Sequence, residues 1–206
     1  MHNILIDELP KSVKVEERTY PINWGYRANM LIEIEMFSDR SDEQKLLDSL
    51  NIFYLGNIPG DMEEAMNQMI WFFKCGKTTG KEKGQRKGQR SYDFEADAFY
   101  IYAAFRTQYN INLNTTLNEQ LHWWEFCAMF DSLSEDLKIS RIMYYRTADL
   151  DGMSKNQKKF IKKMRSLYAI SNSNESDFDN KAKLAKRNAD MLAYVRKRLE
   201  ECRKKE

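Results

Sequence analysis

The stretch Gly76–Arg90, GKTTGKEKGQRKGQR, contains residue types that bind phosphate in many proteins. A phosphate-binding loop of the G-x-x-x-x-G-K-[ST] type needs a first glycine five residues before its Gly-Lys pair. This chain has Trp71 at that position, and Gly80-Lys81 is followed by Glu82, where a hydroxyl group must bind magnesium. The sequence therefore argues against a nucleotide site.

The same stretch is strongly basic and could contact a nucleic-acid backbone through released counterions. Between Lys77 and Arg90, six basic residues and one acidic residue give a net charge of +5, so the rest of this +2 chain is −3. The candidate phosphate-contacting residues are Lys83, Arg86, Lys87 and Arg90.

Two observations weaken the nucleic-acid interpretation. The stretch contains no aromatic residue for base stacking, and the whole chain lacks the basic excess typical of nucleic-acid-binding proteins. A segment without apolar residues cannot offset the entropy lost on ordering. We therefore expect a disordered, extended tether, and we do not expect nucleic acid to be the main partner.

His122 stands beside Trp123 and Trp124, which raises the possibility of a catalytic base or a stacking platform. His2 is the only other histidine, so a site with several histidine ligands for a metal is excluded. Aromatic residues at helical spacing usually belong to the core. The alternative is that Trp123 and Trp124 bind a partner protein.

Tyr144, Tyr145 and Arg146 form a second candidate partner-binding cluster, because Tyr and Arg are enriched at protein interfaces. Carboxylates are numerous, but Asp149 and Asp151 lack the spacing of a calcium loop. We identify no catalytic, cofactor-binding or metal-binding residue. The sequence thus predicts a protein that is not an enzyme and needs no cofactor.

The compartment is indicated by cysteine usage and hydropathy. Cys75, Cys127 and Cys202 are widely spaced and odd in number, which favours free thiols in a reducing cytosol. The longest uncharged apolar run, Ala98–Phe105, is far shorter than the roughly 20 residues of a membrane span. The N-terminus lacks the basic region of a signal peptide. We expect a soluble protein without a membrane partner.

The hydrophobic pattern indicates a mainly α fold with a small N-terminal β-hairpin, a disordered basic loop and a C-terminal amphipathic helix. The hairpin is expected from Ser12–Val15 and Thr19–Ile22, and the first helix over Tyr26–Phe37. The remaining expected helices start at or near Ser41, Asp61, Asp93, Thr116, Ser134 and Ser154.

The expected apolar faces include Met30, Ile34 and Phe37 in the first helix. In the helix after Asp61 the expected buried face is formed by Met62, Met66, Met69, Ile70 and Phe73. The expected organisation is a hairpin segment at 1–24, a helical core domain at 25–170 interrupted by a mobile basic loop at 76–92, a polar linker at 171–180 and a helix at 181–206.

The order of several unusual motifs, especially CGK, YIYAAF and LHWWEF, resembles the bacteriophage "gene product fifteen" family of long-tailed phages and prophages of Gram-positive bacteria. The resemblance covers roughly Asn3 to Tyr168. It implies a tail assembly chaperone in the host bacterial cytoplasm, with many copies or a homo-oligomer on the tape measure protein and with the tail tube protein as a further partner. The alternatives are a minor structural component of the virion and a nucleic-acid-binding phage protein that uses the basic loop.

Overall fold

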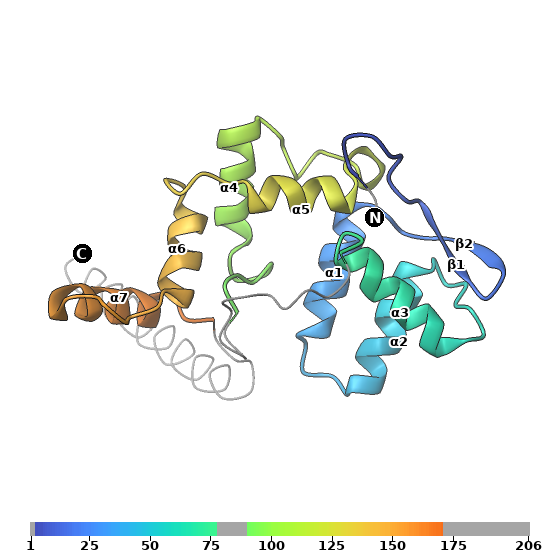
Figure 1. Ribbon diagram of the computed structural model, residues 1–206, viewed down its shortest axis with the longest axis horizontal. Coiled ribbons are helices and arrows are strands. Elements are labelled where there is room, and N and C mark those ends of the chain that lie inside the picture. Colours follow the sequence, from blue (N-terminus) through green and yellow to red (C-terminus); the bar gives the residue numbers. More distant parts are fainter. Residues whose placement is uncertain (1–2, 78–89, 171–206) are drawn as a thin grey trace, which may run out of the picture. The chain divides into compact units, whose positions relative to one another are not determined.

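The computed structural model describes residues 3–77 and 90–170 of the 206-residue chain. Residues 1–170 form one compact unit. Most of the expected basic loop, the linker at 171–180 and the helix at 181–206 lie outside the described residues. The described parts contain seven α-helices and a two-stranded sheet, as the sequence predicted (Figure 1).

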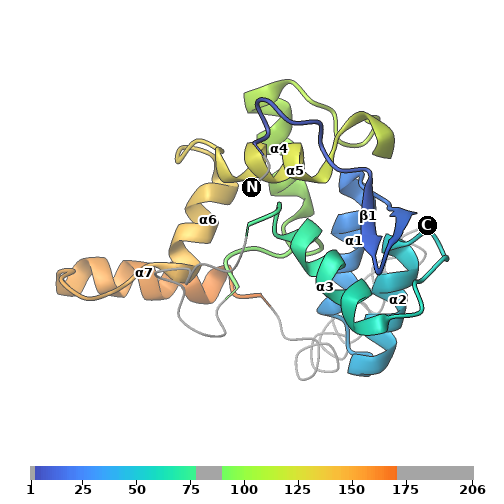
Figure 2. The same ribbon diagram turned by 45° about the vertical axis from the view of Figure 1, so that its right-hand side comes forward.

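The N-terminal hairpin pairs β1 (Ser12–Val15) with β2 (Arg18–Pro21) in antiparallel register. Val13 and Val15 are buried and alternate with exposed residues, so one face of β1 covers the core. The hairpin lies against α3, as Figure 2 shows, and the backbone N–H of Glu16 in its turn donates to the Glu64 carboxylate of that helix. The predicted hairpin is confirmed, with its second strand shifted by one residue.

The first three helices are α1 (Tyr26–Met36), α2 (Asp42–Phe53) and α3 (Met62–Phe73). Ser41 and Asp61 cap α2 and α3 as expected, because their side chains accept the N–H groups of Gln44 and Glu64. α2 packs against both α1 and α3.

The predicted apolar faces of these helices were partly wrong. In α3 the fully buried side chains are Ala65, Met69 and Phe72, whereas Met62 and Ile70 are exposed. On the buried side of α3, the hydroxyl of the fully buried Tyr54 donates a hydrogen bond to the Ala65 carbonyl. In α1, Leu31 and Phe37 are exposed, while the buried set is Tyr26, Ala28, Asn29, Ile32 and Glu33.

The second half contains α4 (Ala98–Tyr109), the short 3-10 helix η1 (Asn118–Gln120), α5 (Trp123–Asp131), α6 (Lys138–Thr147) and α7 (Lys155–Leu167). Asp93 caps a turn rather than a helix, because its carboxylate accepts the N–H groups of Glu95 and Ala96. Regular helix then begins at Ala98.

The expected cap at Thr116 was also wrong, because the Thr116 hydroxyl donates to the Asn112 carbonyl. His122 caps α5 instead. Its Nδ1 accepts the N–H of Trp124, while the Glu125 carboxylate accepts the N–H of His122.

Candidate functional site

His122 is a buried structural residue in this fold. Since Nδ1 accepts a hydrogen bond from Trp124, the ring proton lies on Nε2, which donates to the Pro10 carbonyl at 3.0 Å. The ring also stacks on Trp24. Burial lowers the pKa of His122 below its usual value, so the ring is held neutral and both nitrogens are occupied.

Trp123 and Trp124 are each only 3% exposed and belong to the core. Their indole N–H groups donate to the carbonyls of Phe73 and Phe72, at 3.1 and 2.7 Å, where α3 ends. These bonds add partners to carbonyls in the last turn of α3, and the Phe72 carbonyl also accepts the backbone N–H of Cys75. Because both side chains are enclosed, the fold does not offer this tryptophan pair to a partner protein.

Trp124 also fixes the point where the basic loop leaves the core. Gly76 has a φ of +69°, and a Cβ added there would lie 2.9 Å from Trp124 Cη2. A side chain at position 76 is therefore opposed both by backbone conformation and by space. The prediction that Gly76 is the C-terminal glycine of the helix was off by one residue. The left-handed residue that follows the C-cap Lys74 is Cys75, with a φ of 54°, and Gly76 comes after it.

Arg146 is a buried cation whose hydrogen bonds join several helices. Its two terminal nitrogens form a two-bonded ion pair with Asp97, with the Nη2–Oδ1 distance at 2.9 Å. The guanidinium also donates to the carbonyls of Ser91 and Tyr168. Arg146 is only 5% exposed, so it joins α6, the start of α4 and the end of α7 rather than facing a partner.

The two tyrosines beside Arg146 have different environments. Tyr145 is half-buried, with its ring edge against Phe160 and its face stacked on Tyr168. Tyr144 is 52% exposed. Of the five predicted partner-binding residues, Tyr144 is the one whose side chain is largely accessible.

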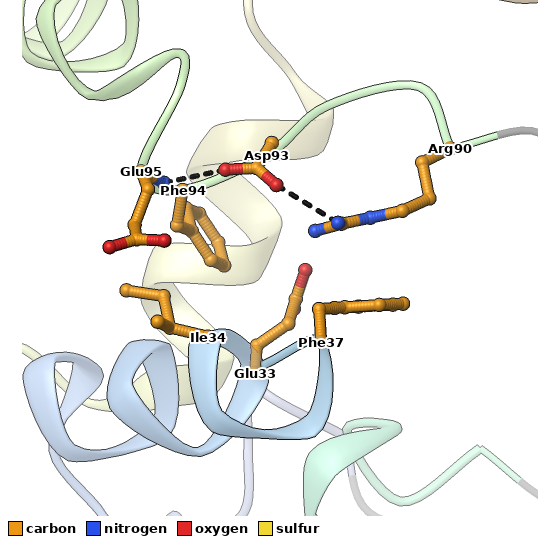
Figure 3. Close-up of a pocket in the computed structure, with 7 residues that line it drawn as sticks. All are labelled: Glu33, Ile34, Phe37, Arg90, Asp93, Phe94 and Glu95. Atoms are coloured by element: carbon orange, nitrogen blue, oxygen red, sulfur yellow. Dashed lines mark hydrogen bonds and ion pairs between the residues drawn. The ribbon is translucent and has the colours of Figure 1, made fainter. Parts of the chain in front are cut away.

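Arg90, the described member of the phosphate-contacting set, lies at the C-terminal base of the basic loop (Figure 3). Its guanidinium lies 3.5 Å from the centre of the Phe37 ring and 2.9 Å from the Asp93 carboxylate. This engagement favours an anchoring role for Arg90. Lys83, Arg86 and Lys87 lie outside the described residues.

Below Arg90 lies a pocket of about 30 Å³ between α1 and the segment that enters α4 (Figure 3). Ligand pockets are typically roughly 300–1,000 Å³, so this pocket has room for about one water molecule. Glu33 points into it and accepts a hydrogen bond from the Tyr92 hydroxyl. Burial raises the pKa of Glu33 to about 7, against the opposing effects of Tyr92 and Arg90.

The thiols of Cys75 and Cys127 are in hydrogen-bond contact, which joins the end of α3 to α5. The bond from Cys127 lowers the pKa of Cys75, whereas the same contact and burial raise the pKa of Cys127. Both cysteines are free. Their proximity could not be read from positions 52 residues apart in the sequence.

Several large apolar side chains lie on the surfaces of the helices. Phe99 on α4 is 88% exposed, and Tyr102 one turn later is also exposed. Phe160 and Leu167 are exposed along α7, where they adjoin a strongly basic surface. Contiguous apolar patches mark contact sites for other proteins, whereas single apolar side chains occur on most protein surfaces.

Two further properties concern the described parts of the chain. No helix there has both the length and the apolar character needed to cross a membrane. Within residues 3–77 and 90–170, no group of three or more His, Cys, Asp or Glu side chains is placed to hold a metal ion.

These features define a helical protein whose buried polar clusters connect its own helices and whose surface carries apolar side chains. The chain belongs to the Bacteriophage Gp15 protein family, which matches residues 5–170. It is therefore a phage protein. The family match ends at residue 170, which is also the last residue of the first compact unit. No curated protein and no solved structure matches the chain.

Proposed function

We propose that this phage protein is a tail assembly chaperone that binds the tape measure protein in the host cytoplasm, with the tail tube protein as a second client. The observation that carries the proposal is the exposure of large apolar side chains on the helices. A chaperone for a long helical client needs such a surface, since an amphipathic helix binds by placing its apolar residues against another apolar surface.

The α4 surface gives this requirement a specific location. Phe99 is 88% exposed, and Tyr102, Ala103 and Arg106 follow it at intervals that place them on one side of the helix. Tyr102 and Arg106 lie one helical turn apart, and Tyr and Arg are enriched among residues that dominate binding energy at protein interfaces. We therefore assign Phe99 as the central client contact.

The proposal is tested by co-expressing the full chain with the tape measure protein of the same genome and measuring complexes by size exclusion with light scattering. We expect a soluble complex that contains many copies of this chain. Phe99→Asp should reduce the recovered complex by at least about tenfold, as for loss of a strong interface contact. Thr107→Asp, an exposed position on the same helix, should leave recovery unchanged.

An insoluble tape measure protein with this chain eluting alone would contradict the proposal. Mass spectrometry of purified virions separates the chaperone from the structural alternative, because a chaperone is absent from mature particles. A minor tail component would be retained there in fixed copy number.

The nucleic-acid alternative has one specific observation in its favour, because α7 adds six basic residues to those of the loop. Binding to DNA that weakens with added salt and is abolished by neutralising Lys83, Arg86 and Lys87 would support it. Unchanged DNA binding in that variant would exclude the loop as the contact.

A further inference from the structure

Charge is divided sharply along the described chain. Residues 3–77 and 90–154 together contain 23 acidic and 13 basic residues, a net charge of −10. α7 and the three residues after it contain six basic residues and no acidic residue, a net charge of +6. Within residues 3–77 and 90–170, α7 is therefore a basic helix attached to an acidic body.

The exposed side of α7 is apolar as well as basic. Phe160 and Leu167 are 52% and 66% exposed, and they lie seven residues apart, which is two helical turns. Lys163 lies three residues after Phe160 and four before Leu167, so it stands between them on the helix surface. We call Lys159, Phe160, Lys163 and Leu167 the α7 face.

The opposite side of α7 is already occupied. Ile161 is buried, and Arg165 donates to the carbonyls of Tyr145 and Ala148, at 3.1 and 2.7 Å. These contacts fix α7 against α6. The α7 face is thus held on a packed helix. Its Phe160 ring contacts Tyr145 of α6 and still leaves about half of the side chain exposed, at 52%.

α3 carries a surface of complementary chemistry. Met62 and Ile70 are exposed, Met66 is half-buried, and the three recur at intervals of four residues along one side of the helix. Glu63 is exposed beside them, and α3 contains two acidic residues and no basic residue. We call Met62, Glu63, Met66 and Ile70 the α3 face.

We propose that the α7 face of one copy binds the α3 face of a second copy. Both surfaces combine exposed apolar side chains with charge, and their charges are opposite, so apolar burial and electrostatic attraction act together. Because the two faces are different surfaces of one chain, the contact is head-to-tail. Repetition of it produces a ring or a filament.

Two other occupants of the α7 face fit less well. The chain's own segment 181–206 has ten basic and four acidic residues, a net charge of +6, so like charge opposes its docking on α7. Nucleic acid would pair with the lysines but would leave Phe160 and Leu167 without an apolar partner. The α3 face offers apolar side chains to Phe160 and Leu167 and an acidic side chain to the lysines of the α7 face.

The test is light scattering of the purified full chain, treated with nuclease, over a range of protein concentrations. We expect a mass of at least twice the 24.5 kDa of one chain, which rises with concentration. Raising the salt from about 50 mM to about 500 mM should lower the mass, since exposed charges are screened. Lys159→Glu with Lys163→Glu should give the monomer mass.

A matched control is provided by Lys183→Glu with Lys186→Glu, which changes the net charge equally but lies outside both faces. This control should assemble like the unmodified chain. Adding Glu63→Lys to the α7 double variant should restore part of the assembly, with circular dichroism showing that all variants fold. A monomer at every concentration, assembly lost on nuclease treatment, or loss in the control alone would overturn the proposal.

Discussion

Arg146 and Asp97 form a two-bonded ion pair in which the side chains are only 6% and 2% exposed. The pair joins α6 to the first residue before α4, which lies 49 positions away. Arg146 also binds the Ser91 carbonyl at the exit of the basic loop. One buried cation thus connects the loop exit to the C-terminal helices.

Arg146→Ala should destabilise the protein strongly, because it leaves the Asp97 carboxylate buried without its compensating charge. Breaking such a pair costs about 3–5 kcal/mol of unfolding free energy. Urea unfolding followed by circular dichroism measures the change. Arg141→Ala, at an exposed position on the same helix, should cost less than about 0.5 kcal/mol. Equal losses of unfolding free energy in the two variants would show that the buried pair contributes no more to stability than an exposed arginine does.

Gly76→Ala should cost more stability than Gly152→Ala, although both glycines have positive φ, of 69° and 77°. Each alanine incurs about 1–2 kcal/mol for a left-handed backbone. Only the Cβ at position 76 meets Trp124, whereas nothing lies within 4 Å of the corresponding atom at position 152. The difference between their unfolding free energies therefore measures the contact with Trp124. A difference of zero would mean that the indole moves aside freely.

Glu33 should make stability depend on pH near neutrality. Its pKa is raised by burial from 4.5 to about 7, so the folded state retains a proton that the unfolded state has released. The free energy of unfolding is then greatest below pH 4.5, falls as the pH rises from 4.5 to about 7, and becomes constant above about pH 7. The total loss is up to about 3 kcal/mol.

Glu33→Gln removes this titration and should flatten the stability profile measured by thermal unfolding from pH 5 to pH 8. The variant should exceed the unmodified protein in stability at pH 8, because no charge has to be buried. Glu43→Gln on the exposed surface of α2 is the control and should leave the profile unchanged. Parallel profiles for all three proteins would refute this role of Glu33.

Cys75 and Cys127 should form a disulfide on mild oxidation, because their thiols are already in contact. Hydrogen peroxide would take two electrons and two protons from the thiol pair and leave two molecules of water. Thiol titration of the unfolded product should then fall from three groups to one, the remaining group being Cys202. The Cys127→Ser variant should retain its two remaining thiols, Cys75 and Cys202, under the same mild oxidation. Random pairing with Cys202 in peptide maps would contradict the predicted contact.

The sequence by itself determined most of the local structure. Ser41 and Asp61 cap helices, and Val13 and Val15 form the inward side of a hairpin. These outcomes depend on neighbouring residues and on the alternation of side chains along a strand. The order of its motifs also indicated the phage family that matches residues 5–170.

The tertiary structure decided which side of each helix became core and which polar groups met. Met62 and Ile70 are exposed whereas Ala65, Met69 and Phe72 are buried, because α3 has apolar residues on several sides and the packing of its neighbours selects one. The Arg146–Asp97 pair and the Cys75–Cys127 contact join residues about 50 positions apart. Such contacts depend on how complete elements pack, and the spacing of residues along one chain does not encode that packing.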